Sequence, residues 1–72
     1  MGKKIFFIGI GGVNMSALAL MSKDLGYLVS GSDKTYNEYI FKLEQNGIDV
    51  FIGHDKNNVK KVDVVVYSDA IN

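Results

Sequence analysis

Several residue types that often define small proteins are missing from this chain of 72 residues. It has no cysteine, which excludes disulfide bonds and zinc sites built on thiolates and fits a reducing cytosol, where we expect the protein to be. It has no proline, and its eight basic and eight acidic residues give a formal net charge of zero. A neutral chain has no general attraction to nucleic acid or to an anionic membrane surface, so we expect neither as a partner.

Long hydrophobic runs are also scarce. The apolar stretch that follows the first lysines is interrupted by Gly9, Gly11, Gly12 and Asn14. A transmembrane helix needs about 20 predominantly apolar residues, and this stretch is shorter and broken by polar ones. It makes better sense as a strand followed by a turn than as a signal peptide or a membrane span.

What the chain does contain is an alternation of strand-like and helix-like segments. Short apolar runs rich in β-forming residues predict strands at residues 4–8, 27–30, 48–52 and 62–67. Apolar residues at helical spacing predict helices at residues 15–25 and 36–45. The polar segment 55–61 is expected to form one turn of helix at most.

This order of elements predicts a Rossmann-like α/β fold, a βαβαβ unit with a fourth strand. Parallel strands joined by right-handed crossovers would give a sheet of order 3-2-1-4. The last run, at residues 62–67, would then form an edge strand, yet it is uniformly apolar and lacks the charges that usually protect an edge. We therefore expect a further strand beside it, and interpret residues 1–72 as an incomplete domain.

The segment from Gly9 to Asn14 lies between the first strand and the first helix, the context in which a glycine motif predicts phosphate binding. Gly9 can take the tight turn, Gly11 allows backbone N–H groups to approach a phosphate, and Gly12 adds another amide. The helix N-terminus contributes further unpaired amides. We expect these bare amides to hold a diphosphate without a cationic side chain. Asn14 replaces the third glycine of the dinucleotide fingerprint and can cap the helix or contact the ligand.

Three other side chains are candidates for the same site. Asp33 follows the glycine turn at about the 20-residue distance expected of the acid that binds a ribose hydroxyl. The alternative is an Asp that caps the following turn, and in either role its charge argues against NADP. Ser68, at the end of the fourth strand, can donate to a phosphate or simply end the strand. His54 is a lone histidine in a loop, and such residues are more often surface than site.

No catalytic set is apparent. A second histidine and the G-x-x-x-x-G-K-[ST] phosphate loop are absent, so we expect neither a catalytic residue nor a metal ligand in this chain. The glycine turn and Asp33 alone do not identify the ligand, because UDP-sugars and NAD both contain a diphosphate and a ribose. Three functions therefore remain open: a UDP-sugar-binding module, an NAD-binding module of a dehydrogenase and a ligand-sensing regulatory domain. A purely structural turn is disfavoured by the glycine cluster.

A resemblance narrows these alternatives. The motif F-I-G-I-G-G-V-N-M-S and the segment L-G-Y-L-V-S-G-S-D resemble the N-terminal domain of the Mur ligases, and the similarity continues at residues 47–48, 51–54, 64–68 and 70–71. Within the family, the sequence is most similar to the type of ligase that joins L-alanine to UDP-N-acetylmuramate. Another type, murein peptide ligase, usually has Cys in its glycine turn, where this chain has Gly11 and Gly12.

The resemblance implies a cytoplasmic, ATP-dependent ligase of peptidoglycan synthesis. In such enzymes the first domain binds the UDP part of UDP-N-acetylmuramate, the central domain binds ATP and Mg²⁺, and the last helps to bind L-alanine. Residues 1–72 would correspond to the first domain, so we expect no cofactor here and no ligation by this chain alone. The substrate-binding residues that the resemblance implies are Gly9, Gly11, Gly12, Val13, Asn14, Met15, Asp33, His54 and Ser68.

The resemblance also assigns parts of the ligand to these residues. The glycine turn and Ser68 would hold the diphosphate, whereas Asp33 and His54 would lie toward the uridine. Two departures bear on this assignment. Asn14 stands where the family usually has Gly, and Asp69 stands where it often has Ser. A carboxylate at Asp69 would oppose a diphosphate unless its side chain points away.

Overall fold

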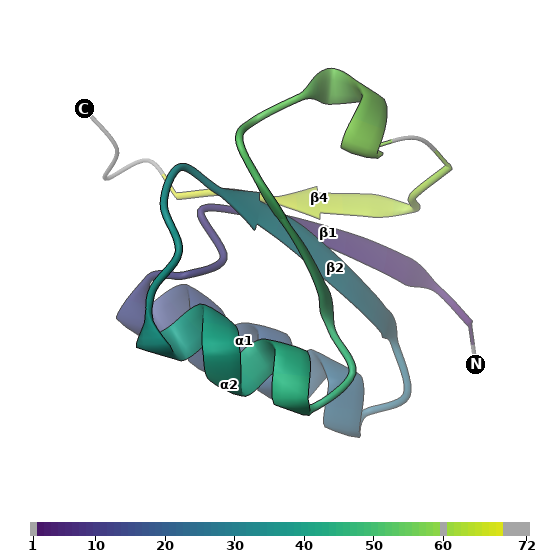
Figure 1. Cartoon of the computed structure of the whole chain (residues 1–72). Helices are drawn as coiled ribbons and strands as arrows, with labels where there is room; N and C mark the ends of the chain where they lie inside the picture. The colour runs from purple at the N-terminus through teal and green to yellow at the C-terminus, as the bar shows by residue number, and fades with distance from the viewer. Residues whose placement is uncertain (1, 60, 69–72) are drawn as a thin grey trace.

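A computed structural model describes residues 2–59 and 61–68 of the chain as a parallel sheet with two α-helices on one face (Figure 1). Its elements in order are β1 (Lys4–Ile8), α1 (Val13–Asp24), β2 (Leu28–Asp33), α2 (Glu38–Gln45), β3 (Asp49–Ile52), the 3₁₀ helix η1 (Lys56–Val59) and β4 (Val64–Val66). The helix η1 lies on the other side of the sheet from α1 and α2 (Figure 1).

The sheet has the order β3-β2-β1-β4 with every pair parallel, which confirms the predicted fold and strand order. β1 is central, and this explains its continuous apolar sequence. In such a sheet the carboxyl ends of all strands lie at one edge. The glycine turn after β1, the end of β2, the loop after β3 and the segment after β4 therefore meet there.

Two strands differ in length from their predictions by more than one residue. The apolar run predicted β2 only to residue 30, but the strand continues to Asp33. Ser, Gly and Asp are poor strand formers, yet pairing with β1 on one side and β3 on the other keeps them extended. The fourth strand is shorter than predicted, because only Val64–Val66 pair with β1.

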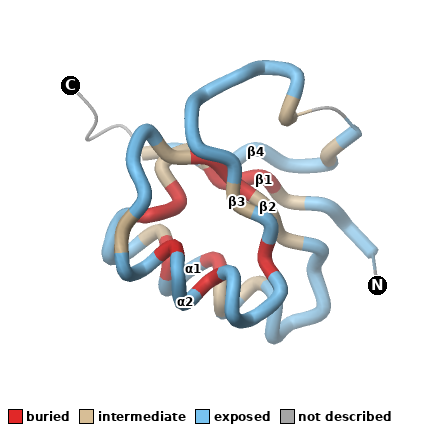
Figure 2. The backbone as a smooth tube through the Cα atoms, in the orientation of Figure 1, coloured by how far each residue is buried: buried red, intermediate tan, exposed pale blue. Residues whose placement is uncertain are grey.

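The core lies between the sheet and the two α-helices, and Figure 2 shows buried residues on the facing sides of these elements. Phe7 and Ile10 pack there with residues of α1 and α2 and with Ile48, which lies just before β3. Gly31 makes this packing possible, since a Cβ on it would lie 2.5 Å from the carbonyl oxygen of Phe7 and 2.6 Å from Cδ1 of Ile10. Ile10 can therefore cover β2 only where β2 has no side chain.

The helix ends show why α1 and α2 begin where they do. α2 begins after Asn37, whose side-chain oxygen accepts from the amide of Ile40 at 2.9 Å. α1 begins at Val13, earlier than predicted, and its N-cap is Gly12, which is extended and has no side-chain cap. The prediction that Asn14 can cap this helix is wrong, because Asn14 lies within its first turn.

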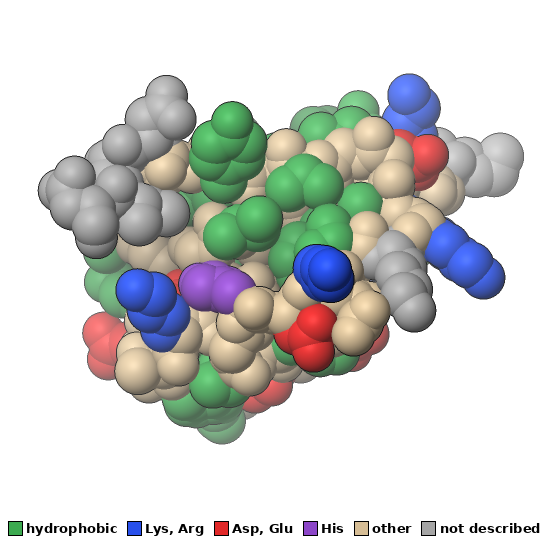
Figure 3. Space-filling model, turned by 90° about the horizontal axis from the view of Figure 1, so that it is seen from above, with side chains coloured by type: hydrophobic (Ala, Val, Ile, Leu, Met, Phe, Trp, Pro, Cys, Tyr) green, Lys and Arg blue, Asp and Glu red, His purple; other side chains and the backbone are tan. Residues whose placement is uncertain are grey.

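Among the described residues, η1 and the loop before it cover the outer face of the sheet. Phe6 and Phe51 stack on this face with their ring centroids 6.4 Å apart. Figure 3 looks onto this side and shows hydrophobic side chains beside the single histidine. Val64 and Val65 of the edge strand β4 are 42% and 39% exposed. No helix among the described residues is long and apolar enough to cross a membrane.

Candidate functional site

The carboxyl-end edge of the sheet carries a hollow of about 290 Å³. It is lined by Ile8, Gly9, Gly12, Val13, Asn14, Met15 and Ser68. Its volume is close to the lower end of the range for small-molecule sites, about 300 Å³. The hollow therefore brings most of the predicted diphosphate-binding residues together, including Ser68 from the segment after β4.

The amides of the glycine turn, however, are already used by the protein. The N–H groups of Gly9 and Ile10 both donate to the carbonyl oxygen of Ser32, at 2.8 and 3.0 Å, and that of Gly12 donates to the carbonyl oxygen of Gly9 at 3.1 Å. Gly9 takes the tight turn as expected, with φ of +83°. The expectation that Gly12 adds a bare amide for a phosphate is wrong in this structure, and the amide of Gly9 is not free either.

Gly11 is held by two side chains. Its N–H donates to Oδ2 of Asp33 at 2.7 Å, and its carbonyl oxygen accepts from Nδ2 of Asn37 at 3.0 Å. A Cβ on Gly11 would lie 2.8 Å from the same Asp33 oxygen. Position 11 therefore requires glycine because the Asp33 side chain occupies the space that a Cβ would need. The prediction that this space is left for a phosphate is wrong in this structure. The other Asp33 oxygen accepts from the amide of Lys34 at 2.7 Å.

The first turn of α1 offers donors that the glycine turn does not. The first backbone bond of the helix runs from the N–H of Ser16 to the carbonyl oxygen of Gly12, at 2.8 Å. The N–H groups of Val13, Asn14 and Met15 have no acceptor among residues 2–59 and 61–68. All three residues line the hollow, and the helix N-terminus carries about +0.5 of an elementary charge. An anion can bind here through main-chain amides, which are the amides of the helix N-terminus that the sequence also predicted, and not those of the glycines.

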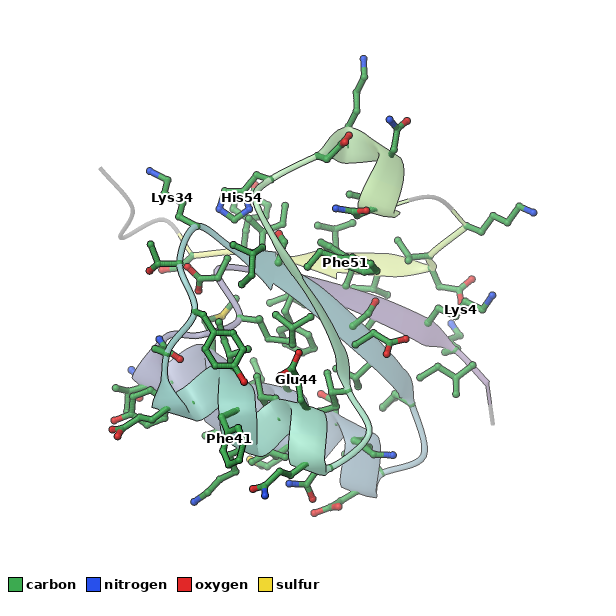
Figure 4. All side chains as sticks on the ribbon, in the orientation of Figure 1. Lys4, Lys34, Phe41, Glu44, Phe51 and His54 are labelled. Carbon is green, nitrogen blue, oxygen red and sulfur yellow. The ribbon has the colours of Figure 1, made fainter. Side chains whose placement is uncertain are left out.

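His54 lies at a second hollow of about 180 Å³ on the outer face, between the end of β2 and η1. Figure 4 shows His54 and Lys34 at the edge of the sheet where the strands have their carboxyl ends. Nδ1 of His54 is 2.8 Å from Oγ of Ser32, which is only 3% exposed. Both hollows are bordered by Ile8, so they lie next to each other.

The contact with Ser32 favours one of the two tautomers of the neutral His54 ring. A buried hydroxyl hydrogen needs an acceptor, and Nδ1 is the one that the described residues give to Ser32. We therefore expect Ser32 to donate and Nδ1 to accept, with the proton of the neutral ring on Nε2. His54 then presents an N–H donor to any ligand in the second hollow.

We expect Ser32→Ala to remove this tautomer preference. Without the hydroxyl donor, the neutral ring can carry its proton on either nitrogen. Because the chain has a single histidine, ¹⁵N–¹H correlation spectra of the imidazole report on it directly. Wild type should show the Nε2–H tautomer at pH 8 and Ser32→Ala a mixture, while Ser22→Ala serves as the control because Ser22 bonds to the backbone of α1 instead. A mixture already present in wild type would contradict the assignment.

The structure also brings in residues that the sequence did not single out. Asn37, Ser32 and Gly31 shape the site from β2 and α2. For Asn37 a signal existed, since an Asn immediately before a helical pattern predicts an N-cap. Nothing in the sequence marked Ser32 as the partner of His54. Asp69 and residues 70–71, which also entered the resemblance, lie outside the described residues.

Comparison with known proteins decides the family. The model of the Mur ligase family, catalytic domain, matches residues 4–72. The chain belongs to the Mur ligase family. Among curated members, UDP-N-acetylmuramate–L-alanine ligases of Clostridium botulinum (strain Eklund 17B) and of a Hydrogenobaculum species are 52% and 51% identical to it over 69 residues. Those matches cover 96% of this chain but only 15% of each relative.

Solved structures of Mur ligases share the fold. The UDP-N-acetylmuramate–alanine ligase of Thermotoga maritima matches with a TM-score of 0.89 at 38% identity, over 96% of this chain and 16% of that one. A murein peptide ligase of Psychrobacter arcticus matches with a TM-score of 0.90 at 34% identity, over 99% and 15%. The fold alone therefore does not separate these two types. Membership of the Mur ligases does disfavour the dehydrogenase alternative.

Proposed function

We propose that this chain binds the UDP part of UDP-N-acetylmuramate, as the N-terminal substrate-binding domain of a UDP-N-acetylmuramate–L-alanine ligase in peptidoglycan synthesis. The names of the relatives at 52% and 51% identity support the type of ligase. The observation that carries the binding site is the set of three backbone N–H groups, of Val13, Asn14 and Met15, that line the larger hollow without an acceptor in the described residues.

In this proposal the diphosphate lies at the N-terminus of α1. The side chains of Val13 and Asn14 are exposed and that of Met15 packs against the core, so the three residues contribute main-chain donors. Ser68 lines the same hollow, and in this proposal its hydroxyl would contact the diphosphate. Gly9, Gly11 and Gly12 shape the backbone path that leads to these donors.

The uridine would extend toward the second hollow, across Ile8, where His54 offers its Nε2–H to a carbonyl oxygen of the base. Asp33 holds the glycine turn, and each of its oxygens already accepts one backbone N–H. A carboxylate oxygen has a second lone pair, so a ribose hydroxyl can still donate to Asp33 without displacing Gly11.

The remaining chemistry belongs to other parts of the ligase. Among the described residues no group of three or more His, Asp or Glu side chains could hold a metal ion, and the sequence has no G-K-[ST] phosphate loop. In this proposal ATP, Mg²⁺ and L-alanine bind to parts of the ligase outside residues 1–72, and we expect no ligation by this chain alone. We place the full enzyme in the cytoplasm, where its nucleotide substrates are.

The proposal is tested by titrating the ¹⁵N-labelled chain with UDP-N-acetylmuramate and, separately, with NAD. We expect the amide resonances of Val13, Asn14 and Met15 to move most with the UDP ligand, because their N–H groups would gain charged acceptors. NAD also carries a diphosphate, so the comparison tests recognition of the uridine and the sugar, and NAD should cause smaller shifts. A larger response to NAD, or shifts that leave these three amides unchanged, would reject the proposal.

A further inference from the structure

We propose that Asp33 and Asn37 are positioning residues that clamp Gly11 from both sides and so fix the direction of the first turn of α1. Their effect on ligand affinity rests on the proposed UDP binding, whereas the clamp itself can be tested without ligand. In this role Asp33 acts through the backbone of Gly11, and not mainly through a contact with the ribose.

The clamp uses both polar groups of the Gly11 main chain. Asp33, the last residue of β2, accepts from its N–H at 2.7 Å, and Asn37, just before α2, donates to its carbonyl oxygen at 3.0 Å. Gly11 is buried and both side chains are partly buried, so water competes only weakly for these bonds. Two elements from another part of the sequence therefore hold one glycine of the turn.

Asn37 is suited to this role because its side chain acts in two directions. Its Oδ1 accepts from the amide of Ile40 at 2.9 Å and caps α2, while its Nδ2 donates to Gly11. Asp or Ser would cap the helix about as well as Asn. Asp has no donor, and the shorter Ser side chain cannot span both partners. The amide side chain therefore couples the start of α2 to the glycine turn.

The clamp matters for binding because it holds the part of the turn nearest the unpaired amides, whereas the bonds of Gly9 and Ile10 to Ser32 hold only its start. α1 has no side-chain N-cap, and Gly11 is followed by only one residue before the first unpaired amide, at Val13. A turn with three glycines that is free to move would lose conformational entropy when it orders around a ligand. Holding Gly11 in the ligand-free protein removes part of that cost.

The test compares Asn37→Ser with the matched variant Asn46→Ser. Asn46 also bonds to a backbone carbonyl, that of Lys42 at 2.9 Å, but at the other end of α2. In the ligand-free chain we expect Asn37→Ser to speed hydrogen exchange of the Gly11 and Gly12 amides about tenfold, and to raise the Kd for UDP-N-acetylmuramate by a similar factor, the effect of one hydrogen bond. Asn46→Ser should change neither, and both variants should keep the circular dichroism spectrum of wild type.

A second pair of variants tests Asp33 by conservative rescue. Asp33→Asn keeps an oxygen that can accept from Gly11, whereas Asp33→Ala does not. We expect the alanine variant to speed Gly11 exchange in the absence of ligand and the asparagine variant to restore slow exchange. A ribose contact alone would change affinity without changing exchange in the free chain.

The outcomes separate the two proposals. Unchanged Gly11 exchange in both Asn37→Ser and Asp33→Ala would overturn the clamp, whatever the ligand does. Faster exchange with unchanged Kd would overturn its positioning role. Faster exchange in a chain whose wild type gives no response to UDP-N-acetylmuramate would support the clamp and reject the proposed function.

Discussion

Gly31→Ala is expected to destabilise the fold more than any other single methyl group added to this chain's glycine turn or to β2. A Cβ at this position would lie 2.5 Å from the carbonyl oxygen of Phe7, 2.6 Å from Cδ1 of Ile10 and 2.8 Å from Cβ of Ile10. The carbonyl oxygen belongs to the central strand β1, and Cβ of Ile10 is fixed to the backbone of the glycine turn. Neither can move away by a side-chain rotation, so the strands or the turn must shift.

The cost of that shift is large compared with the stability of so short a chain. Overpacking a core typically costs about 1–3 kcal/mol, and contacts with backbone atoms favour the upper end. Native proteins are stable by roughly 0.05–0.15 kcal/mol per residue, which leaves a small domain little reserve. We therefore expect the urea midpoint, followed by circular dichroism, to fall by at least half.

Gly12→Ala is the matched control for this substitution. Its Cβ would meet nothing closer than 3.6 Å, and Gly12 has φ of −69°, which alanine adopts freely. Alanine is a weaker N-cap than glycine, but it also restricts the unfolded chain, so the free energy of unfolding should stay within about 1 kcal/mol of wild type. A Gly31→Ala variant as stable as Gly12→Ala would show that Ile10 does not cross β2 as described.

The topology could be predicted from the sequence because it depends on local patterns. The apolar run of β1, the helical spacing in α1 and α2 and the glycines between them each specify one element, and right-handed parallel connections then leave the order 3-2-1-4. Strand limits were less predictable. β2 reaches Asp33 only because two neighbouring strands pair with residues that have low strand propensity.

The hydrogen bonds of the site could not be predicted in the same way, because they join distant parts of the chain. Gly11 is 22 residues from Asp33 and 26 from Asn37, and Ser32 is 22 from His54. The spacing of Asp33 from the glycine turn was recognised, but the same spacing suits a ribose contact and a bond to the turn. Only the folded geometry shows that the carboxylate accepts from Gly11.

Val13→Pro is expected to weaken ligand binding without weakening the fold. Val13 is the first residue of α1, the helical position where proline is favoured. Its N–H has no acceptor among the described residues, and the residue before it, Gly12, has the extended conformation that proline requires of its neighbour. The side chain is 62% exposed, so little packing is lost. The melting temperature should stay the same or rise, because proline restricts the unfolded chain.

The same substitution removes one of the three donors proposed for the diphosphate. A hydrogen bond to a charged group contributes about 1.5–3 kcal/mol, so the Kd for UDP-N-acetylmuramate, measured by calorimetry or by amide shifts, should rise at least about tenfold. Val13→Ala is the control, since it removes the side chain and keeps the N–H, and it should bind as wild type does. If Val13→Pro and Val13→Ala bind equally well while both remain folded, the Val13 amide does not contact the ligand. The anion site would then have to lie elsewhere on this edge of the sheet.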